Sequence, residues 1–120
     1  MTATANTLFD PGLLSGGENN YNILRNQTVT PLNVPVGIAD TLFSMNAAAG
    51  ALTVNLPRAA AVPDGTEFIF KKIDSSANVV TINVASGSSD LIDGAASTTV
   101  TTQWAFKRLV CDGVSAWVLT

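Results

Sequence analysis

The chain has 120 residues, enough for one domain with a buried core, and only 12% of them are charged, about half the share of a typical soluble domain. A net charge of −3 with only six basic residues argues against a nucleic-acid footprint, which needs clustered Lys and Arg. No stretch approaches the ~20 apolar residues of a membrane span, and the N-terminus lacks the basic and apolar regions of a signal peptide, so we expect synthesis in the cytoplasm and no membrane partner. The adjacent basic pairs Lys71-Lys72 and Lys107-Arg108 are expected at the solvated rims of strands.

The first 25 residues differ from the rest of the chain. Glycines and a proline interrupt residues 1–20, and the isolated apolar residues follow neither a helical nor a strand period. These apolar residues are Leu8, Phe9, Leu13 and Leu14. Chain termini are ordered only when they are tied down, so we predict that residues 1–25 form an extended arm whose apolar side chains dock onto another surface. The alternative is a terminus that folds back on its own domain.

Residues 27–62 have the pattern of a β protein. Pro31 and Pro35 favour edge or irregular extended structure after the β-prone Thr28–Thr30. A turn is expected at residues 46–50, and an Ala-rich helical turn at residues 58–62. The extended segments that we predict around these turns are 28–30, 38–45 and 52–56, the last of which alternates cleanly and ends at a proline.

Two segments rich in β-branched and aromatic residues, 66–73 and 78–84, follow the turn sequence Pro63-Asp64-Gly65. Between them lies Asp74-Ser-Ser-Ala77, where the Asp74 side chain can hydrogen-bond to its own backbone and reverse the chain. We therefore predict that the two segments pair as an antiparallel hairpin.

The last third of the chain repeats short strands and turns. Strands are predicted at 91–92, 98–102, 104–111 and 114–119. Asp93-Gly94 and Asp112-Gly113 are strong hairpin signals, since both central residues of a type I′ turn need positive φ. About eight short strands with a turn signal every eight to twelve residues predict an all-β domain, a compact sandwich or barrel-like fold, over residues 26–120.

The last predicted hairpin is apolar on both faces. Phe106 and Val110 share one face, while Ala105, Leu109 and Cys111 share the other. A strand with one solvated face would alternate, so a second cover is expected, and in so small a domain that cover is another subunit. We therefore predict Trp104, Phe106 and Leu109 as subunit-interface residues. The single cysteine is expected in the core.

Residues with catalytic chemistry are scarce. The chain has no histidine, which excludes His-based triads and His-containing zinc sites, and its one cysteine excludes thiolate clusters. No phosphate-binding glycine motif is present. The sequence therefore predicts a non-enzymatic protein without cofactor or metal.

A pair of carboxylates is the one arrangement left that could support catalysis. Asp90 and Asp93 lie three residues apart in a predicted loop and could serve a glycosidase or bind calcium. The competing interpretation is that Asp64, Asp74, Asp93 and Asp112 occupy turns, where Asp is favoured for its backbone geometry. We favour the turn interpretation. The aromatic residues could instead form a sugar-binding platform, although core or interface packing is the preferred interpretation for both tryptophans. These residues are Trp104, Trp117, Tyr21 and the five phenylalanines.

A series of ordered motifs resembles a β module that is widespread in virion proteins of tailed bacteriophages. The resemblance covers roughly residues 52–119. The motifs are Leu52-Thr-Val-Asn-Leu-Pro57, Pro63-Asp-Gly-Thr66, Phe70-Lys-Lys-Ile-Asp-Ser-Ser-Ala-Asn78, Val80-Thr-Ile82, Ile92-Asp-Gly-Ala95, Val100-Thr-Thr-Gln103, and Leu109-Val-Cys-Asp-Gly113 followed by Trp117.

The resemblance implies a homotrimer that serves as a fibre knob or as a capsid decoration (cement) protein. A short arm in front of one module, without heptad or Gly-X-Y repeats for a shaft, favours decoration of the outer capsid surface. The implied partner is the major capsid protein, which the arm would contact. The alternative is a small head-fibre or tail-fibre component that binds a host-surface glycan.

Overall fold

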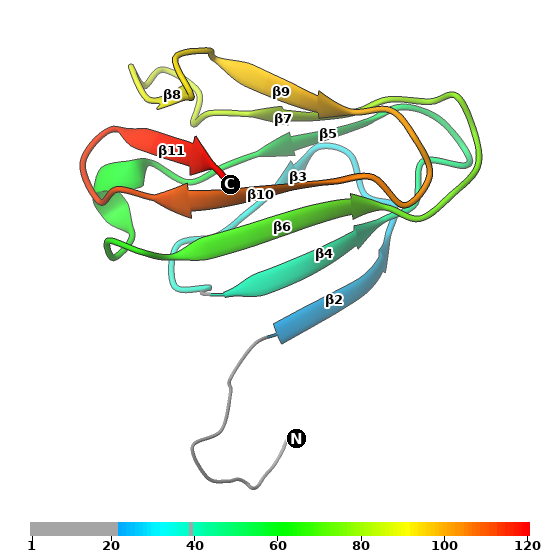
Figure 1. The fold of residues 1–120 in the computed structure, drawn as a ribbon, viewed down its shortest axis with the longest axis horizontal. Coiled ribbons are helices and arrows are strands. Elements are labelled where there is room, and N and C mark those ends of the chain that lie inside the picture. Colours follow the sequence, from blue (N-terminus) through cyan, green and yellow to red (C-terminus); the bar gives the residue numbers. More distant parts are fainter. Residues whose placement is uncertain (1–21, 39) are drawn as a thin grey trace, which may run out of the picture.

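The computed structural model describes residues 22–38 and 40–120, and in this part of the chain the fold is two β-sheets (Figure 1). The six-stranded sheet has the order β2-β4-β6-β10-β11-β8. Its strands are β2 (Asn22–Gln27), β4 (Thr41–Met45), β6 (Glu67–Lys72), β10 (Phe106–Cys111), β11 (Ala116–Leu119) and β8 (Leu91–Ile92). The four-stranded sheet has the order β3-β5-β7-β9. It contains β3 (Leu32–Asn33), β5 (Leu52–Asn55), β7 (Val80–Asn83) and β9 (Ser97–Val100). The predicted all-β class is confirmed.

Successive strands from β2 to β10 alternate between the two sheets. Each sheet therefore contains neighbours that run parallel, β2-β4-β6 in one and β3-β5-β7 in the other. Of the expected reversals, β10 and β11 do form an antiparallel hairpin, with Cys111 opposite Trp117.

The predicted hairpin of residues 66–73 with 78–84 is wrong. These residues form β6 and β7, which lie in different sheets. Both edges of β6 are already occupied, since β4 pairs with one and β10 with the other. The chain after Lys72 must therefore cross to the opposite sheet.

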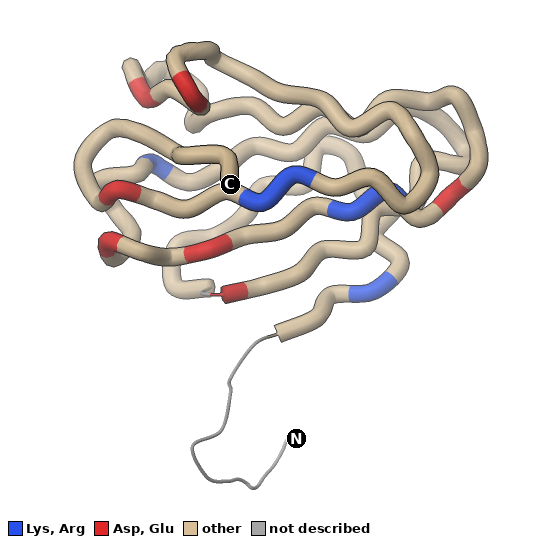
Figure 2. The backbone as a smooth tube through the Cα atoms, in the orientation of Figure 1, with Lys and Arg blue, Asp and Glu red and all other residues tan. Residues whose placement is uncertain are grey.

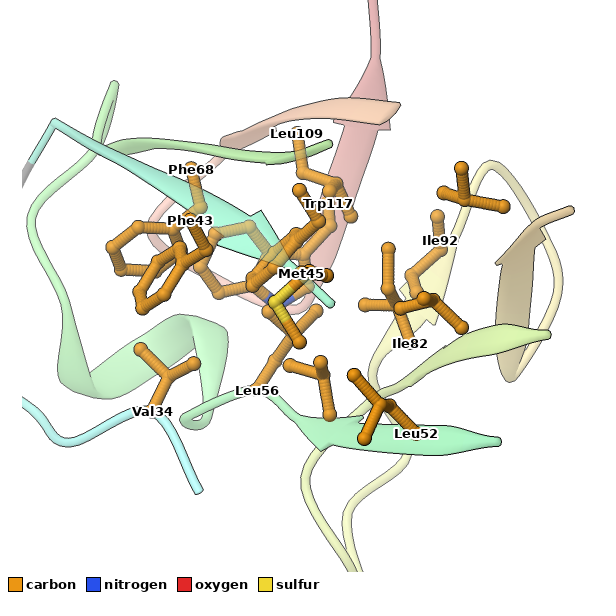
Figure 3. Close-up of a cluster of buried hydrophobic side chains, with 14 of the residues drawn as sticks. Val34, Phe43, Met45, Leu52, Leu56, Phe68, Ile82, Ile92, Leu109 and Trp117 are labelled. Carbon is orange, nitrogen blue, oxygen red and sulfur yellow. The ribbon is translucent and has the colours of Figure 1, made fainter. Parts of the chain in front are cut away.

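The two sheets enclose one apolar core (Figure 3). Strand alternation explains its composition, because β4 and β6 each bury every second residue. Four aromatic side chains meet there: the ring centroids of Phe43 and Phe70 lie 4.7 Å apart, and those of Phe68 and Trp117 lie 5.6 Å apart. The opposite sheet contributes aliphatic residues, including Val54 and Ile82. Cys111 is buried in the core as predicted.

Most predicted strands are present with shorter bounds, and a 3₁₀ turn at Ala59–Ala61 (η1) replaces the expected helical turn. The predicted boundary between arm and domain at residue 25 falls inside β2, which pairs with β4 from Asn22 onward. Residues 22–25 therefore belong to the sheet. Strand β2 is nevertheless exposed along almost its whole length, as an edge strand.

The two Asp-Gly sequences form different turns. At Asp93-Gly94 both residues have positive φ, 47° and 86°, and the flanking Ile92 and Ala95 exchange backbone hydrogen bonds, as in a type I′ turn. In the β10–β11 hairpin only Gly113 has positive φ. The loop there is longer, because Asp112 caps the following amides instead.

Candidate interaction surface

The predicted interaction residues fall into three groups in the structure. Leu8, Phe9, Leu13 and Leu14 of the predicted arm lie outside the described residues. Trp104 and Phe106 are 58% and 52% exposed, so the domain leaves both available to a partner. Leu109 is fully buried in the domain core, which leaves none of its side chain for a second subunit. The predicted role of Leu109 is therefore wrong, because strand alternation turns it inward.

The outer face of the six-stranded sheet carries several apolar side chains. On β10 and β11, Val110 lies opposite Val118, which is 45% exposed. Phe106 of β10 lies opposite Lys71 of β6. Of the two apolar faces of the hairpin, one therefore packs in the core, and the other lies on the outside of the sheet and is partly exposed in the single chain.

Trp104 occupies a strained position in a tight turn. The Ala105 amide donates to the Thr102 carbonyl at 3.0 Å, which closes a four-residue turn, and Trp104, the third residue, has a φ of 69°. Type II turns require positive φ at this position and therefore favour glycine. A bulky residue there costs about 1–3 kcal/mol. The turn is fixed to β6 by the Trp104 amide, which donates to the Lys72 carbonyl at 2.7 Å.

Replacement of this tryptophan by glycine tests whether the ring serves the fold. We expect Trp104→Gly to leave the free energy of unfolding unchanged or to raise it by up to about 1 kcal/mol, since relief of strain offsets the lost contacts and the extra backbone entropy of glycine. Urea denaturation followed by far-UV circular dichroism measures this. A loss of more than about 2 kcal/mol would show that the ring stabilises the domain itself.

Lys71, Trp104 and Phe106 form what we call the aromatic patch. The Lys71 ammonium lies 5.9 Å from the centroid of the Trp104 ring, within the range of a cation–π contact. Further along β10, Arg108 forms an ion pair with Glu67 on the same outer face. The patch therefore combines two exposed rings with positive charge.

The opposite end of the sheet carries the acidic turns, which we define as the turns that contain Asp64 and Asp112 (Figure 2). The Gly65 amide donates to the Cys111 carbonyl at 2.8 Å, and a Cβ added to Gly113 would lie 3.1 Å from the Asp64 Cβ, so the turns pack together. Both carboxylates are exposed. Backbone hydrogen bonds from Val114, Ala116 and Ser115 lower the pKa of Asp112, which keeps it ionised.

Lys72 is fully buried, so the predicted solvated rim is wrong at this residue. It is the last residue of β6 and faces inward by the alternation of the strand. Its Nζ donates to the Asp74 carboxylate at 2.8 Å, to the Asp74 carbonyl at 3.1 Å and to the Ser76 carbonyl at 2.8 Å. All three donors of the ammonium therefore have an acceptor.

The Asp74 carboxylate organises the crossing from β6 to β7. It accepts hydrogen bonds from the Ala47 amide at 2.7 Å, from the Ser76 amide at 3.0 Å and from the Ser76 hydroxyl. Burial disfavours the charged carboxylate, but together the hydrogen bonds from Lys72, Ser76 and Ala47 outweigh it and hold the pKa of Asp74 far below its ordinary value. The predicted turn role of Asp74 is confirmed.

Asp90 and Asp93 each have a structural partner on a different element. The Asp90 carboxylate is buried and accepts the Ala59 amide at the start of η1 at 2.8 Å. The exposed Asp93 carboxylate accepts the Leu119 amide at 3.1 Å. Within residues 22–38 and 40–120, no three Asp, Glu, Cys or His residues cluster as metal ligands. These contacts support the turn interpretation over a paired-carboxylate site.

Among the described residues, two shallow hollows have volumes of about 140 and 180 Å³, smaller than the usual 300–1,000 Å³ of ligand pockets. The smaller lies beside the turn at Gly50 and the larger against β2 and Ile38, and neither is lined by an ionisable side chain. No helix in the described part of the chain is long and apolar enough to cross a membrane. The aromatic patch and the outer sheet face combine exposed apolar side chains with charge, which suits an interaction.

Neither the models of known protein families nor the curated proteins include one that matches this chain.

Proposed function

We propose that this chain is a structural protein of a tailed-phage virion, a decoration protein that binds the outer capsid surface as a homotrimer and stabilises the shell. The observation that carries the proposal is the exposed Trp104 ring, held at a backbone position that favours glycine. A strained, exposed aromatic residue contributes little to the domain alone and points to a contact outside it. The resemblance of residues 52–119 to a trimeric virion module indicates the kind of assembly.

The outer sheet face supports the trimer. Phe106 and Val118 each keep about half of their surface exposed, and they lie on adjacent strands of one face. Burial of the exposed half of each side chain contributes about 1 kcal/mol, before the cost of association. Aromatic residues near the centre of an interface are typical binding hot spots.

The arm supplies the proposed contact with the major capsid protein. Leu8, Phe9, Leu13 and Leu14 would bind apolar hollows of the shell, and three arms in one trimer would act together through a high effective concentration. Because the trimer binds the assembled lattice and not the free subunits, it stabilises the lattice by mass action.

Removal of residues 2–20 tests this role. We expect the truncated protein to remain a folded trimer but to lose binding to undecorated capsids, measured by co-sedimentation and quantitative gel analysis. Leu8→Ser/Phe9→Ser should reproduce the loss, whereas the matched polar control Thr4→Ala/Asn6→Ala should bind like the wild type. Full occupancy of capsids by the truncated protein would refute the contact by the arm.

The exposed Trp104 ring also keeps a second candidate function open, recognition of a host-surface glycan by a small fibre component. The copy number separates the two functions, since a fibre component is present in a few copies per virion and a decoration protein in hundreds. Saturable binding to host polysaccharide that is lost in Trp104→Gly would support the fibre function.

A further inference from the structure

On the outer face of the six-stranded sheet, the sign of the charged side chains differs between the two ends of the strands. In β6, the acidic Glu67 lies at the beginning and the basic Lys71 near the end (Figure 2). Strand β10 runs antiparallel to β6, so its Phe106 lies beside Lys71, whereas its Arg108, on the same outer face, forms an ion pair with Glu67. The acidic turns lie at the other end of both strands. Because Arg108 pairs with Glu67, the charges left at the two ends of this face are that of Lys71, beside the two aromatic rings, and those of the exposed Asp64 and Asp112 carboxylates.

The two ends are far enough apart to act as separate surfaces. Glu67, the residue of β6 nearest to the acidic turns, lies four positions before Lys71, which is about 13 Å along an extended strand. That distance exceeds the ~8 Å screening length of physiological salt. The charges at one end therefore neutralise those at the other only weakly within one chain.

We propose that copies of this chain associate head to tail, with the aromatic patch of one copy against the acidic turns of the next. In this contact Lys71 faces Asp64 and Asp112, and the rings of Trp104 and Phe106 are covered. The inference rests on the proposed function, because it names the surfaces that hold the trimer together.

The charges disfavour the simplest alternative contact. If the aromatic patch met the same patch of a second copy, Lys71 would face Lys71, and the like charges would repel. A contact between unlike patches is also what a closed three-fold ring requires, since every subunit must present two different surfaces.

Charge reversal tests the contact. The oligomer is measured by sedimentation velocity and light scattering of the full chain at 0.15 M salt. Lys71→Glu and Asp64→Lys should each raise the dissociation constant of the oligomer at least about tenfold, because each places like charges in the contact. The double variant Lys71→Glu/Asp64→Lys restores opposite charges and should return the constant to within about threefold of the wild type.

Both positions suit substitution. The Thr66 amide donates to the Pro63 carbonyl at 3.1 Å, so Asp64 is the second residue of a turn whose third residue, Gly65, supplies the positive φ. Lys71 points outward from β6. Arg58→Glu is the matched control: it reverses an exposed positive charge between β5 and η1 and should leave the dissociation constant unchanged. Thermal unfolding of each variant establishes that it is folded.

A mixing experiment determines the symmetry of the contact. Lys71→Glu carries two acidic surfaces, whereas Asp64→Lys keeps the basic aromatic patch and has turns in which the new positive charge offsets Asp112, so in their mixture contacts between unlike variants are favoured over contacts between like ones. A two-fold arrangement yields a heterodimer, whereas a three-fold ring cannot alternate and yields no heterotrimer. Absence of any heterodimer, with recovery of the trimer in the double variant, is the result expected here.

The proposal is overturned if the wild type is a monomer, if the two single reversals leave its dissociation constant unchanged, or if the double variant is no better than the singles. Co-sedimentation with capsids distinguishes a failure of this contact from a failure of the proposed function. A wild-type monomer that still binds capsids would retain the decoration role and refute the head-to-tail contact. A trimer that responds to the charge reversals as expected but binds no capsids would support the head-to-tail contact and refute the decoration role.

Discussion

Asp74→Ala is expected to lower the free energy of unfolding by about 3–5 kcal/mol, because it leaves the buried Lys72 ammonium without its counter-ion. The same substitution also removes the acceptor of the Ala47 and Ser76 amides. Urea denaturation at neutral pH measures the change. Asp64→Ala, the same substitution in an exposed turn, is the control and should change the free energy by no more than about 0.5 kcal/mol.

The double variant Lys72→Met/Asp74→Ala separates the ion pair from the amide contacts. Removal of both charges should be less destabilising than Asp74→Ala alone, since no unpaired charge remains in the core. If the double variant is instead at least as unstable as the single one, the buried pair is not the source of the effect.

The pH dependence of stability identifies the ionised form of Asp74. Its pKa is lowered in the folded state, so its contribution is fully present above the pKa of an unfolded aspartate, about 3.9, and is lost as the pH falls through the folded value. We therefore compare the free energy of unfolding of the wild type with that of Lys72→Met/Asp74→Ala. The difference should be constant between pH 5 and 7, which is about one to three units above the pKa of the unfolded aspartate, and should shrink as the pH falls below that pKa. An unchanged difference at pH 2–3, about one to two units below the unfolded pKa, would falsify this assignment.

Trp117→Ala is the second substitution with a large expected effect, a loss of about 3–5 kcal/mol. The Trp117 side chain is fully buried and stacks on Phe68, so its removal leaves a cavity between the sheets. Trp117→Phe should cost much less, about 1.5 kcal/mol or below, because it keeps an aromatic ring and also removes the indole N–H, which has no hydrogen-bond partner among residues 22–38 and 40–120. Urea denaturation of both variants measures these values, and Trp104→Gly is the control for loss of a tryptophan at the surface. Equal losses in the Ala and Phe variants would contradict a packing role for the ring.

Local patterns in the sequence predicted the individual strands well. Alternation in 52–56 indicated which residues of β5 face the core, because successive side chains of a strand point to opposite faces. The β-branched and aromatic content of 66–73 indicated strand β6, and turn chemistry placed turns at Asp93-Gly94 and at Asp74. The same local reasoning failed for the hairpin of β6 and β7, since a turn sequence does not specify which sheet the next strand joins.

The candidate surface was predictable only in part. Trp104 and Phe106 were predicted as interface residues from the apolar character of both faces, and both are exposed. Leu109 was assigned to the same surface, although its alternation with Phe106 places it on the opposite face of β10. The positive φ of Trp104 could not be predicted from the sequence, because the third residue of a type II turn is usually a glycine.

By itself the sequence determined that the chain is an all-β domain, poor in charge and without histidine, in which a segment such as 52–56 alternates between a core face and an outer face. Those properties depend on the residue types and on the alternation of side chains along a strand, and both can be read from short stretches of sequence. Only the tertiary structure decided that strands alternate between two sheets, that Lys72 is buried against Asp74, and that Phe106 lies beside Lys71 on the outer face. The physical reason is that strand pairing and the burial of a charge depend on partners distant in the sequence, for which the local pattern carries no information.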